Sequence, residues 1–123
     1  SMANALIRIG KEFQPLVPPR GSVAASIQAA LPHSHVAAAL HHVPAKELGQ
    51  LDDPIESDVL ICSDFPDASA AAADLVAKIP NMRPLDCGEL SLATPIESFT
   101  AVLLQLNVRY KTRVAVKFTA IPE

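Results

Sequence analysis

Two adjacent histidines, His41 and His42, follow an apolar run over residues 36–40. A neutral imidazole can hydrogen-bond a ligand, carry a proton near neutral pH or coordinate a metal. Neighbouring side chains on a strand point to opposite faces, so at most one of the two is expected to face a given cleft. His33 and His35 lie at the other end of the run, too far away to complete a metal site. We therefore expect no metal: either one histidine is a polar contact in a site, or both are hydrogen-bonded loop residues.

Further polar residues lie on a predicted helix and after predicted strands. Thr100 and Asn107 are seven residues apart, on one shoulder of the helix's apolar face, and Ser98 lies nearer its start. Polar groups beside an apolar stripe are either helix surface or the polar rim that a flat cofactor needs. Four carboxylates follow predicted strands, where they either form caps and turns or face a ligand: Asp64, Asp67, Asp86 and Glu89.

The basic cluster of the sequence comprises Arg109, Lys111 and Arg113. It either complements the macrodipole at the end of a helix or binds an anion. The net charge is −3 at pH 7 and there is no long basic run, so we do not expect a nucleic-acid surface.

The composition fits one soluble domain. Half of the 123 residues are apolar, enough for a core, and no segment has the length and apolarity of a membrane span. Cys62 and Cys87 lie in apolar contexts without zinc-site spacing, which favours buried, reduced thiols and a cytoplasmic location. The opening Ser1 and Met2 are either a tag remnant or an internal segment of a longer chain.

The elements that must position these residues alternate between strands and helices. Residues 1–21 are predicted to be a loop-rich lead-in with room for a hairpin. Ser22 is predicted to cap a short helix that Pro32 ends, and a capping box at residues 94–97 is predicted to start a long one. A further helix is predicted over residues 67–79, and a helical turn over residues 44–49. Strands are predicted over residues 35–40, 57–64, 82–88 and, at a sheet edge, 114–119.

Two helices are predicted to bury one apolar face each. The faces are Ala71, Leu75, Val76 and Ile79 on the first, and Ile96, Phe99, Leu103, Leu106 and Tyr110 on the second.

This pattern predicts a single α/β unit over residues 1–123: a partial Rossmann-like sheet, parallel or mixed, with a long C-terminal helix and a closing strand. The histidines would follow a strand at the carboxyl edge of the sheet, where ligands bind in open α/β sheets. The four glycines, at positions 10, 21, 49 and 88, cannot form a G-x-G-x-x-G turn or a P-loop.

Four stretches of the sequence resemble stretches of a known protein family: AALHHVPAKEL (38–48), DVLICSD (58–64), MRPLDCGELSLATPIESFTAVLLQLNVRYK (82–111) and VAVKFT (114–119). Together they resemble the C-terminal half of the NADPH-dependent reductases of coenzyme F420, the F420-dependent NADP oxidoreductase family. The likeness runs from Met2 to Ile121. It leaves out that family's N-terminal Rossmann half, whose glycine-rich turn holds NADP.

The resemblance implies reversible hydride transfer between reduced coenzyme F420, a deazaflavin, and NADP. His41 would be the catalytic residue, orienting the carbonyl edge of the deazaflavin and handling the accompanying proton, and His42 would not be needed. The resemblance also implies cofactor contacts: His41, Val43, Ser98 and Thr100 on the deazaflavin side, and Pro44 and Ala45 by the nicotinamide. We add Asn107 on the polar shoulder to this set, and the basic cluster could meet the anionic tail of the deazaflavin.

A competing hypothesis is that the chain acts without catalysis, as a deazaflavin-binding or dimerisation module or an inactive fragment. A parallel sheet that lacks several strands exposes an edge and an apolar face. We therefore expect a homo-oligomer or an association with the missing N-terminal half.

Overall fold

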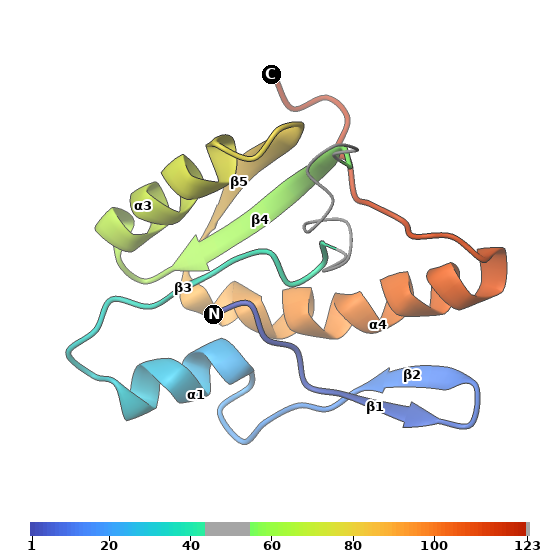
Figure 1. The fold of residues 1–123 in the computed structure, drawn as a ribbon. Helices are drawn as coiled ribbons and strands as arrows, with labels where there is room; N and C mark the ends of the chain where they lie inside the picture. The colour runs from blue at the N-terminus through green and yellow to red at the C-terminus, as the bar shows by residue number, and fades with distance from the viewer. Residues whose placement is uncertain (44–54, 123) are drawn as a thin grey trace.

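The computed structural model describes residues 1–43 and 55–122. It is a mixed α/β fold, as the sequence predicts, and Figure 1 shows the arrangement of its elements. The strands are β1 (Leu6–Ile9), β2 (Glu12–Pro15), β3 (Ala37–Ala38), β4 (Ser57–Ser63) and β5 (Met82–Gly88). The described helices are α1 (Val23–Ala30), α3 (Pro66–Ala77) and α4 (Ala93–Tyr110), with a 3-10 turn at Leu90–Leu92. The predicted turn over residues 44–49 lies outside the described residues.

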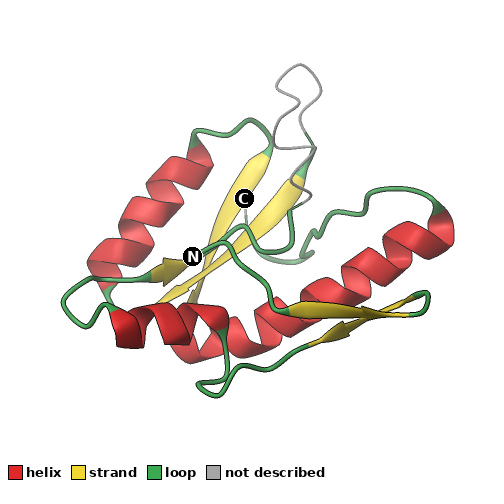
Figure 2. Cartoon of the chain, turned by 60° about the horizontal axis from the view of Figure 1, so that its bottom comes forward, coloured by secondary structure: helices red, strands yellow, loops and turns green. Residues whose placement is uncertain are grey.

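Three strands form the main sheet in the order β3, β4, β5, and β1 and β2 form a separate hairpin (Figure 2). β4 and β5 run parallel, whereas β3 runs antiparallel to β4. The hairpin agrees with the strand-like alternation in the lead-in. It turns at Gly10, whose φ of 62° is a left-handed conformation that glycine adopts without strain.

Alternate side chains of β4 face two cores. Val59 and Ile61 pack with Val76 of α3, while Cys62 packs on the opposite face with Ile96 of α4. Because side chains alternate between the faces of a strand, this apolar run fills both layers. α3 therefore covers one face of the sheet, and α1 and α4 cover the other (Figure 1).

The strand predicted over residues 35–40 is shorter than expected and runs antiparallel to its neighbour β4. Only Ala37 and Ala38 pair with β4, because Leu40 turns the chain away with a left-handed φ of 64°. The two histidines after it therefore do not lie at the carboxyl edge of the parallel strands. His42 lies beside the middle of β4, where its Nε2 accepts a hydrogen bond from the amide of Leu60 at 3.3 Å.

The closing stretch over residues 114–119 is not a strand, contrary to the prediction. Its backbone instead bonds to the first two residues of β4, Ser57 and Asp58. The amide of Asp58 donates to the carbonyl of Val116 at 2.7 Å, and the Asp58 carboxylate accepts from the amide of Phe118 at 2.6 Å. The Asp58 carboxylate thus accepts a hydrogen bond that a neighbouring strand would accept, and residues 114–119 form no β-ladder.

The helix faces are only partly as predicted. In α3, Ala71 and Leu75 are exposed, whereas Val76 is buried as expected. In α4, Phe99 and Tyr110 are exposed. Both helices carry small or apolar residues outside the predicted stripe, so the sequence pattern alone does not define which arc faces the core. The observed buried residues are Ser69 and Val76 in α3, and Ala93, Ile96, Glu97, Thr100, Ala101 and Leu103 in α4.

Glu97 has a different role from the one that the capping box predicts. α4 begins at Ala93, and its N-cap makes no side-chain hydrogen bond. The buried Glu97 carboxylate instead accepts hydrogen bonds from the amides of Val23 at 2.8 Å and Ala24 at 3.1 Å, at the start of α1. Ser22 also caps the start of α1, as predicted, so Ser22 and Glu97 act at the same end of this helix. A carboxylate there satisfies free N–H groups and meets the positive end of the helix dipole, so it fixes α1 against α4.

We expect Glu97→Ala to lower the free energy of unfolding by about 1–3 kcal/mol, because two amides of α1 lose a charged acceptor inside the protein. Glu97→Gln keeps one acceptor oxygen and should lose less. Urea unfolding followed by circular dichroism measures both variants. Equal stability of Glu97→Ala and the unmodified chain would contradict the capping role.

Candidate functional site

A hollow of about 410 Å³ lies between the N-terminal segment, the turn after β3 and the second half of α4. We name it the His41 hollow. Its size and its mixture of apolar and polar walls are typical of a small-molecule site. The described residues that line it are Met2, Asn4, Leu6, Leu40, His41, His42, Val43, Thr100, Leu103, Leu104, Asn107, Arg113 and Val114.

His41 is the most unusual residue of this hollow. Its side chain is buried, with the residue only 4% exposed, and neither ring nitrogen has a hydrogen-bond partner among the described residues. Burial, and to a smaller degree the neighbouring His42, lowers the pKa of His41 to about 4. The imidazole is therefore neutral near pH 7, with one N–H donor and one acceptor nitrogen. A buried polar group of this kind normally has a partner, so its lack of one among the described residues makes His41 the candidate ligand contact of the hollow.

Thr100 is connected to the turn after β3 through a residue that the sequence analysis did not single out. Its hydroxyl donates to Oδ1 of Asn4 at 3.0 Å, and Nδ2 of Asn4 donates to the carbonyl of His41 at 3.0 Å. This chain of hydrogen bonds fixes the position of the His41 backbone relative to α4. Asn4 lies in a lead-in predicted as a loop, 96 residues from Thr100, so no local pattern could have identified it.

The two other predicted residues in the hollow, Val43 and Asn107, have different roles. Val43 is a buried apolar residue of the wall. Oδ1 of Asn107 accepts a hydrogen bond from the amide of Val114 at 2.7 Å, which holds the segment after α4 at the rim. The structure therefore brings together four of the predicted site residues: His41, Val43, Thr100 and Asn107.

The remaining predicted residues are not placed in the hollow. Ser98 is half-buried on α4 and is not among the lining residues. At 3.6 residues per turn, two positions differ by about 200° around the helix axis, so Ser98 and Thr100 face different sides. Pro44 and Ala45 lie outside the described residues.

His42 departs from the prediction because it lines the same hollow as His41. The expectation that adjacent side chains diverge holds on a strand, and both histidines lie in the turn that follows β3. His42 supports the structure through its hydrogen bond with Leu60. Burial lowers its pKa as well.

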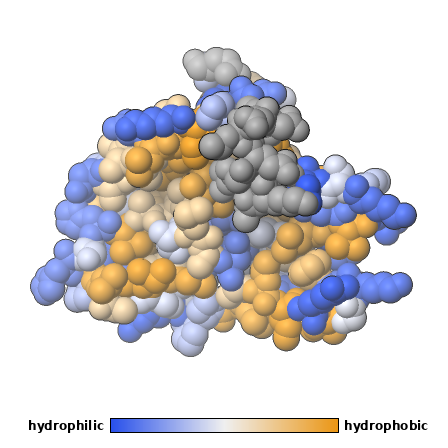
Figure 3. Space-filling model, in the orientation of Figure 1, coloured by the Kyte–Doolittle hydropathy of each residue, from blue (hydrophilic) through white to orange (hydrophobic). Residues whose placement is uncertain are grey.

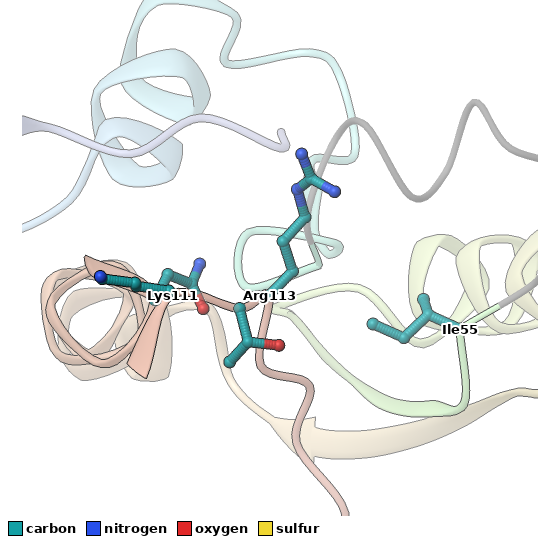
Figure 4. A pocket seen from close by; sticks show the side chains of 5 residues that line it. Ile55, Lys111 and Arg113 are labelled. Carbon is teal, nitrogen blue, oxygen red and sulfur yellow. The ribbon is translucent and has the colours of Figure 1, made fainter. Parts of the chain in front are cut away.

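A second hollow, of about 550 Å³, lies at the end of α4, and we name it the Lys111 hollow. Figure 4 shows Lys111 and Arg113 extending from the segment that ends α4, with Ile55 on the opposite wall. Asn107 and Thr112 complete the described lining. Asn107 and Arg113 also line the His41 hollow, so the two hollows adjoin.

Three of the four predicted carboxylates form turns or pairs, whereas Glu89 precedes the 3-10 turn without a side-chain capping bond. Asp64 accepts from the amide of Leu90, and Asp86 accepts from the amide of Gly88. Asp67 contacts Nδ1 of His35 at 2.8 Å. In the described part of the chain, no three histidine, cysteine or acidic side chains gather as a metal site would require.

Both cysteines are free thiols, and Cys62 is buried. Burial raises the pKa of the Cys62 thiol to about 11, so it is unreactive near neutral pH. None of the helices in the described ranges combines the length and the apolarity that a bilayer span requires.

The fold and the His41 hollow define an α/β chain with a candidate site for a small molecule. No protein-family model matches the chain. Three curated relatives, each 38% identical to it, are named F420-dependent NADP reductase. The relative from Methanocaldococcus jannaschii matches over 80% of this chain, and those from Methanothermobacter thermautotrophicus and Methanothermobacter marburgensis match over 73%. The resemblance predicted from the sequence motifs is thereby confirmed.

The matches cover 44%, 39% and 41% of these relatives, so the chain spans less than half of their length. A crystal structure from Arthrobacter sp. FB24, provisionally named as an F420-dependent NADP reductase, has the same fold with a TM-score of 0.78. It is 19% identical, and the alignment covers 95% of this chain and 56% of that one.

Proposed function

We propose that this chain is the deazaflavin-receiving part of an oxidoreductase that transfers a hydride between reduced coenzyme F420 and NADP. The names of the curated relatives support this reaction. The observation that carries the proposal is the imidazole of His41, which is buried without a partner among the described residues in a hollow that also contains Thr100. The two free thiols support a cytoplasmic location.

The residues of the His41 hollow fit a flat ring with polar edges. Val43 and Leu103 offer apolar surface for the faces of the ring, and the neutral His41 offers one donor and one acceptor for its edge. When bound, the deazaflavin supplies the hydride chemistry itself. The protein orients the ring, excludes water from it and, at a nitrogen of His41, holds or releases the accompanying proton.

We assign the hydroxyl of Thr100 to positioning the ligand and His41. Its proton is donated to Asn4, so its oxygen keeps a lone pair for a ligand donor. Through Asn4 it also fixes the carbonyl of His41. Binding of NADP phosphates by a glycine-rich turn would have to come from outside these 123 residues, whose four glycines cannot form one.

A second candidate function is a deazaflavin-binding or dimerisation module without catalysis. It is favoured by the exposed apolar side chains of the lead-in, Ile7, Ile9, Leu16 and Val17. Figure 3 shows apolar surface over the β1–β2 hairpin. We propose that a second copy or an NADP-binding half covers this surface. The two functions differ in one result: only the enzyme oxidises reduced coenzyme F420 with NADP once an NADP-binding half is supplied.

We expect the chain to bind coenzyme F420 saturably, and Thr100→Val to weaken binding about 5–10-fold, the effect of one lost hydrogen bond near the ligand. Titration followed by deazaflavin fluorescence measures the affinity. Ser98→Ala is the matched control, because it removes a hydroxyl from the same helix on a face outside the hollow, and it should leave the affinity unchanged. Equal losses in both variants, or no saturable binding, would refute the site.

A further inference from the structure

We propose that His42 is a specificity-determining residue of the His41 hollow, and that its Nδ1–H group donates a hydrogen bond to a carbonyl oxygen of the flat ligand. The ligand edge that fits is an imide, in which an N–H group lies between two carbonyls, as in the pyrimidinedione ring of a deazaflavin. This inference rests on the proposed function, because it concerns the same ligand. The family resemblance leaves His42 out of the site, so it does not imply this contact.

The hydrogen bond between His42 and β4 determines which ring nitrogen carries the proton. Nε2 accepts from the amide of Leu60 at 3.3 Å, so this nitrogen presents its lone pair and has no proton. Burial lowers the pKa of His42, which favours the neutral ring near pH 7. A neutral imidazole carries one N–H group, and in His42 that group is therefore at Nδ1. The bond with Leu60 also fixes the orientation of the ring, so the donor has a defined direction.

This donor lies where a ligand can use it. His42 lines the His41 hollow, and the residue is only 3% exposed. Its Nδ1 has no hydrogen-bond partner among the described residues. Buried N–H groups normally have an acceptor, and leaving one unpaired costs free energy. A carbonyl oxygen of a ligand in the hollow supplies that acceptor.

His41 and Thr100 supply the acceptors that an imide edge also needs. His42 contributes to the lowered pKa of His41, so the two rings lie close together. The neutral His41 has one acceptor nitrogen, and neither of its nitrogens has a partner among the described residues. The hydroxyl of Thr100 donates its proton to Asn4 and keeps a lone pair. A donor beside an acceptor matches a carbonyl beside an N–H group, which is the pattern of an imide.

The alternative interpretation is that His42 only supports β4. Its bond with Leu60 accounts for Nε2 and leaves Nδ1 unexplained. If the support of β4 were the whole role, any side chain with an acceptor at the position of Nε2 would serve equally well. The two interpretations therefore differ in whether a donor at the position of Nδ1 matters for the ligand.

Two variants separate the two nitrogens of His42. The amide of glutamine is one bond further from the backbone than that of asparagine, so glutamine reaches the position of Nε2 and asparagine that of Nδ1. His42→Gln can thus accept from Leu60 without offering a donor at Nδ1, and His42→Asn does the reverse. His33→Gln is the matched control, because it makes the same change at an exposed histidine that does not line the hollow.

The probes are coenzyme F420 and lumichrome, a flat ring with the same imide edge and no attached chain. We expect His42→Gln to weaken binding of both about 3–10-fold, the effect of one lost hydrogen bond, and to keep the thermal midpoint. His42→Asn should recover part of that affinity but have a lower thermal midpoint, since the amide of Leu60 loses its acceptor. His33→Gln should change neither quantity. Affinity for both rings that is unchanged in His42→Gln, or that falls equally in His33→Gln, would overturn the proposal.

Nitrogen NMR of the chain with labelled histidines tests the tautomer without any ligand. A proton on Nδ1 of His42 is expected, and a proton on Nε2 would overturn the assignment of the donor. The signal is assigned by its loss in His42→Gln, which leaves the three other histidines in place.

Lumichrome separates this inference from the proposed function. If lumichrome binds and responds to His42→Gln while coenzyme F420 does not bind, the proposed function fails and the imide contact stands. If coenzyme F420 binds the unmodified chain and His42→Gln equally well, the inference fails and the proposed function stands. If neither ring binds, both are wrong.

The carboxamide of nicotinamide also presents a carbonyl beside an N–H group, so nicotinamide mononucleotide is measured in parallel. We expect His42→Gln to leave its affinity unchanged. If this ligand loses affinity in His42→Gln and neither flat ring does, the donor belongs to the nicotinamide and the assignment to an imide is wrong.

Discussion

Replacing Arg83 with alanine is expected to lower the free energy of unfolding by about 3–5 kcal/mol, because it leaves a buried carboxylate without its cation. Asp58 is fully buried, and its two oxygens accept hydrogen bonds from Nε and Nη2 of Arg83, each at 2.7 Å. Arg83 also donates to the carbonyls of Phe118 and Ile121. One guanidinium on β5 therefore joins β4 to the C-terminal segment.

The double variant Arg83→Ala/Asp58→Asn is the control for this prediction. An amide at position 58 can still accept from Phe118 and carries no charge, so the double variant should be more stable than Arg83→Ala alone. Urea unfolding at pH 7 measures both variants. If Arg83→Ala lowered the free energy of unfolding by less than about 1 kcal/mol, water would be solvating the Asp58 carboxylate in place of Arg83.

The same pair makes stability depend on pH. The bonds from Arg83 lower the pKa of Asp58 below its ordinary value of 3.8. The stabilisation is thus complete above the unfolded pKa and is lost as pH falls through the lower folded one.

Much of the fold follows from local patterns. β4 and β5 were predictable because their apolar runs are bounded by turn residues, and α1 was predictable because Ser22 and Pro32 mark its ends. The hairpin agrees with the alternation over residues 6–9 before Gly10, within a lead-in predicted to be rich in loops. These signals lie within a few residues of the element they specify, so a single sequence contains them.

The failures share a physical cause, which is a partner distant in sequence. The direction of β3 depends on its pairing with β4, which no local signal encodes. Glu97 has the spacing of a capping box, yet the free amides that it satisfies belong to α1, more than 70 residues away. The closing stretch has strand-like alternation, but its backbone bonds to Asp58 and to the side chain of Arg83 instead of to a strand.

The site was predictable to the extent that helix geometry determines it. Thr100 and Asn107, seven residues apart, do share a face and line one hollow. The same geometry argues against Ser98, which family likeness had added to the set. Asn4 required the tertiary structure, because nothing near it in the sequence indicates a contact with α4.

The chain is expected to lose stability as the pH falls from about 6.5 towards 4, with His41 contributing about 3 kcal/mol over this interval. Burial holds the pKa of His41 at about 4 in the folded chain, against an ordinary value of 6.5. Between these values the unfolded chain binds a proton that the folded chain excludes, so the free energy of unfolding rises with pH there and is level above it. Urea unfolding at half-unit pH steps measures the slope.

His41→Leu separates this contribution from other acid effects. Leucine has a similar volume and no titrating group, so the variant should lose the part of the slope due to His41 and keep the part due to His42, whose pKa is also lowered by burial. It should also be at least as stable as the unmodified chain at pH 7, since it removes an imidazole whose two nitrogens have no partner among the described residues. Its affinity for coenzyme F420 should fall tenfold or more if that imidazole contacts the ring. If the free energy of unfolding of His41→Leu kept the same slope against pH, the buried imidazole would not resist protonation. The assignment of a neutral donor and acceptor at His41 would then be wrong.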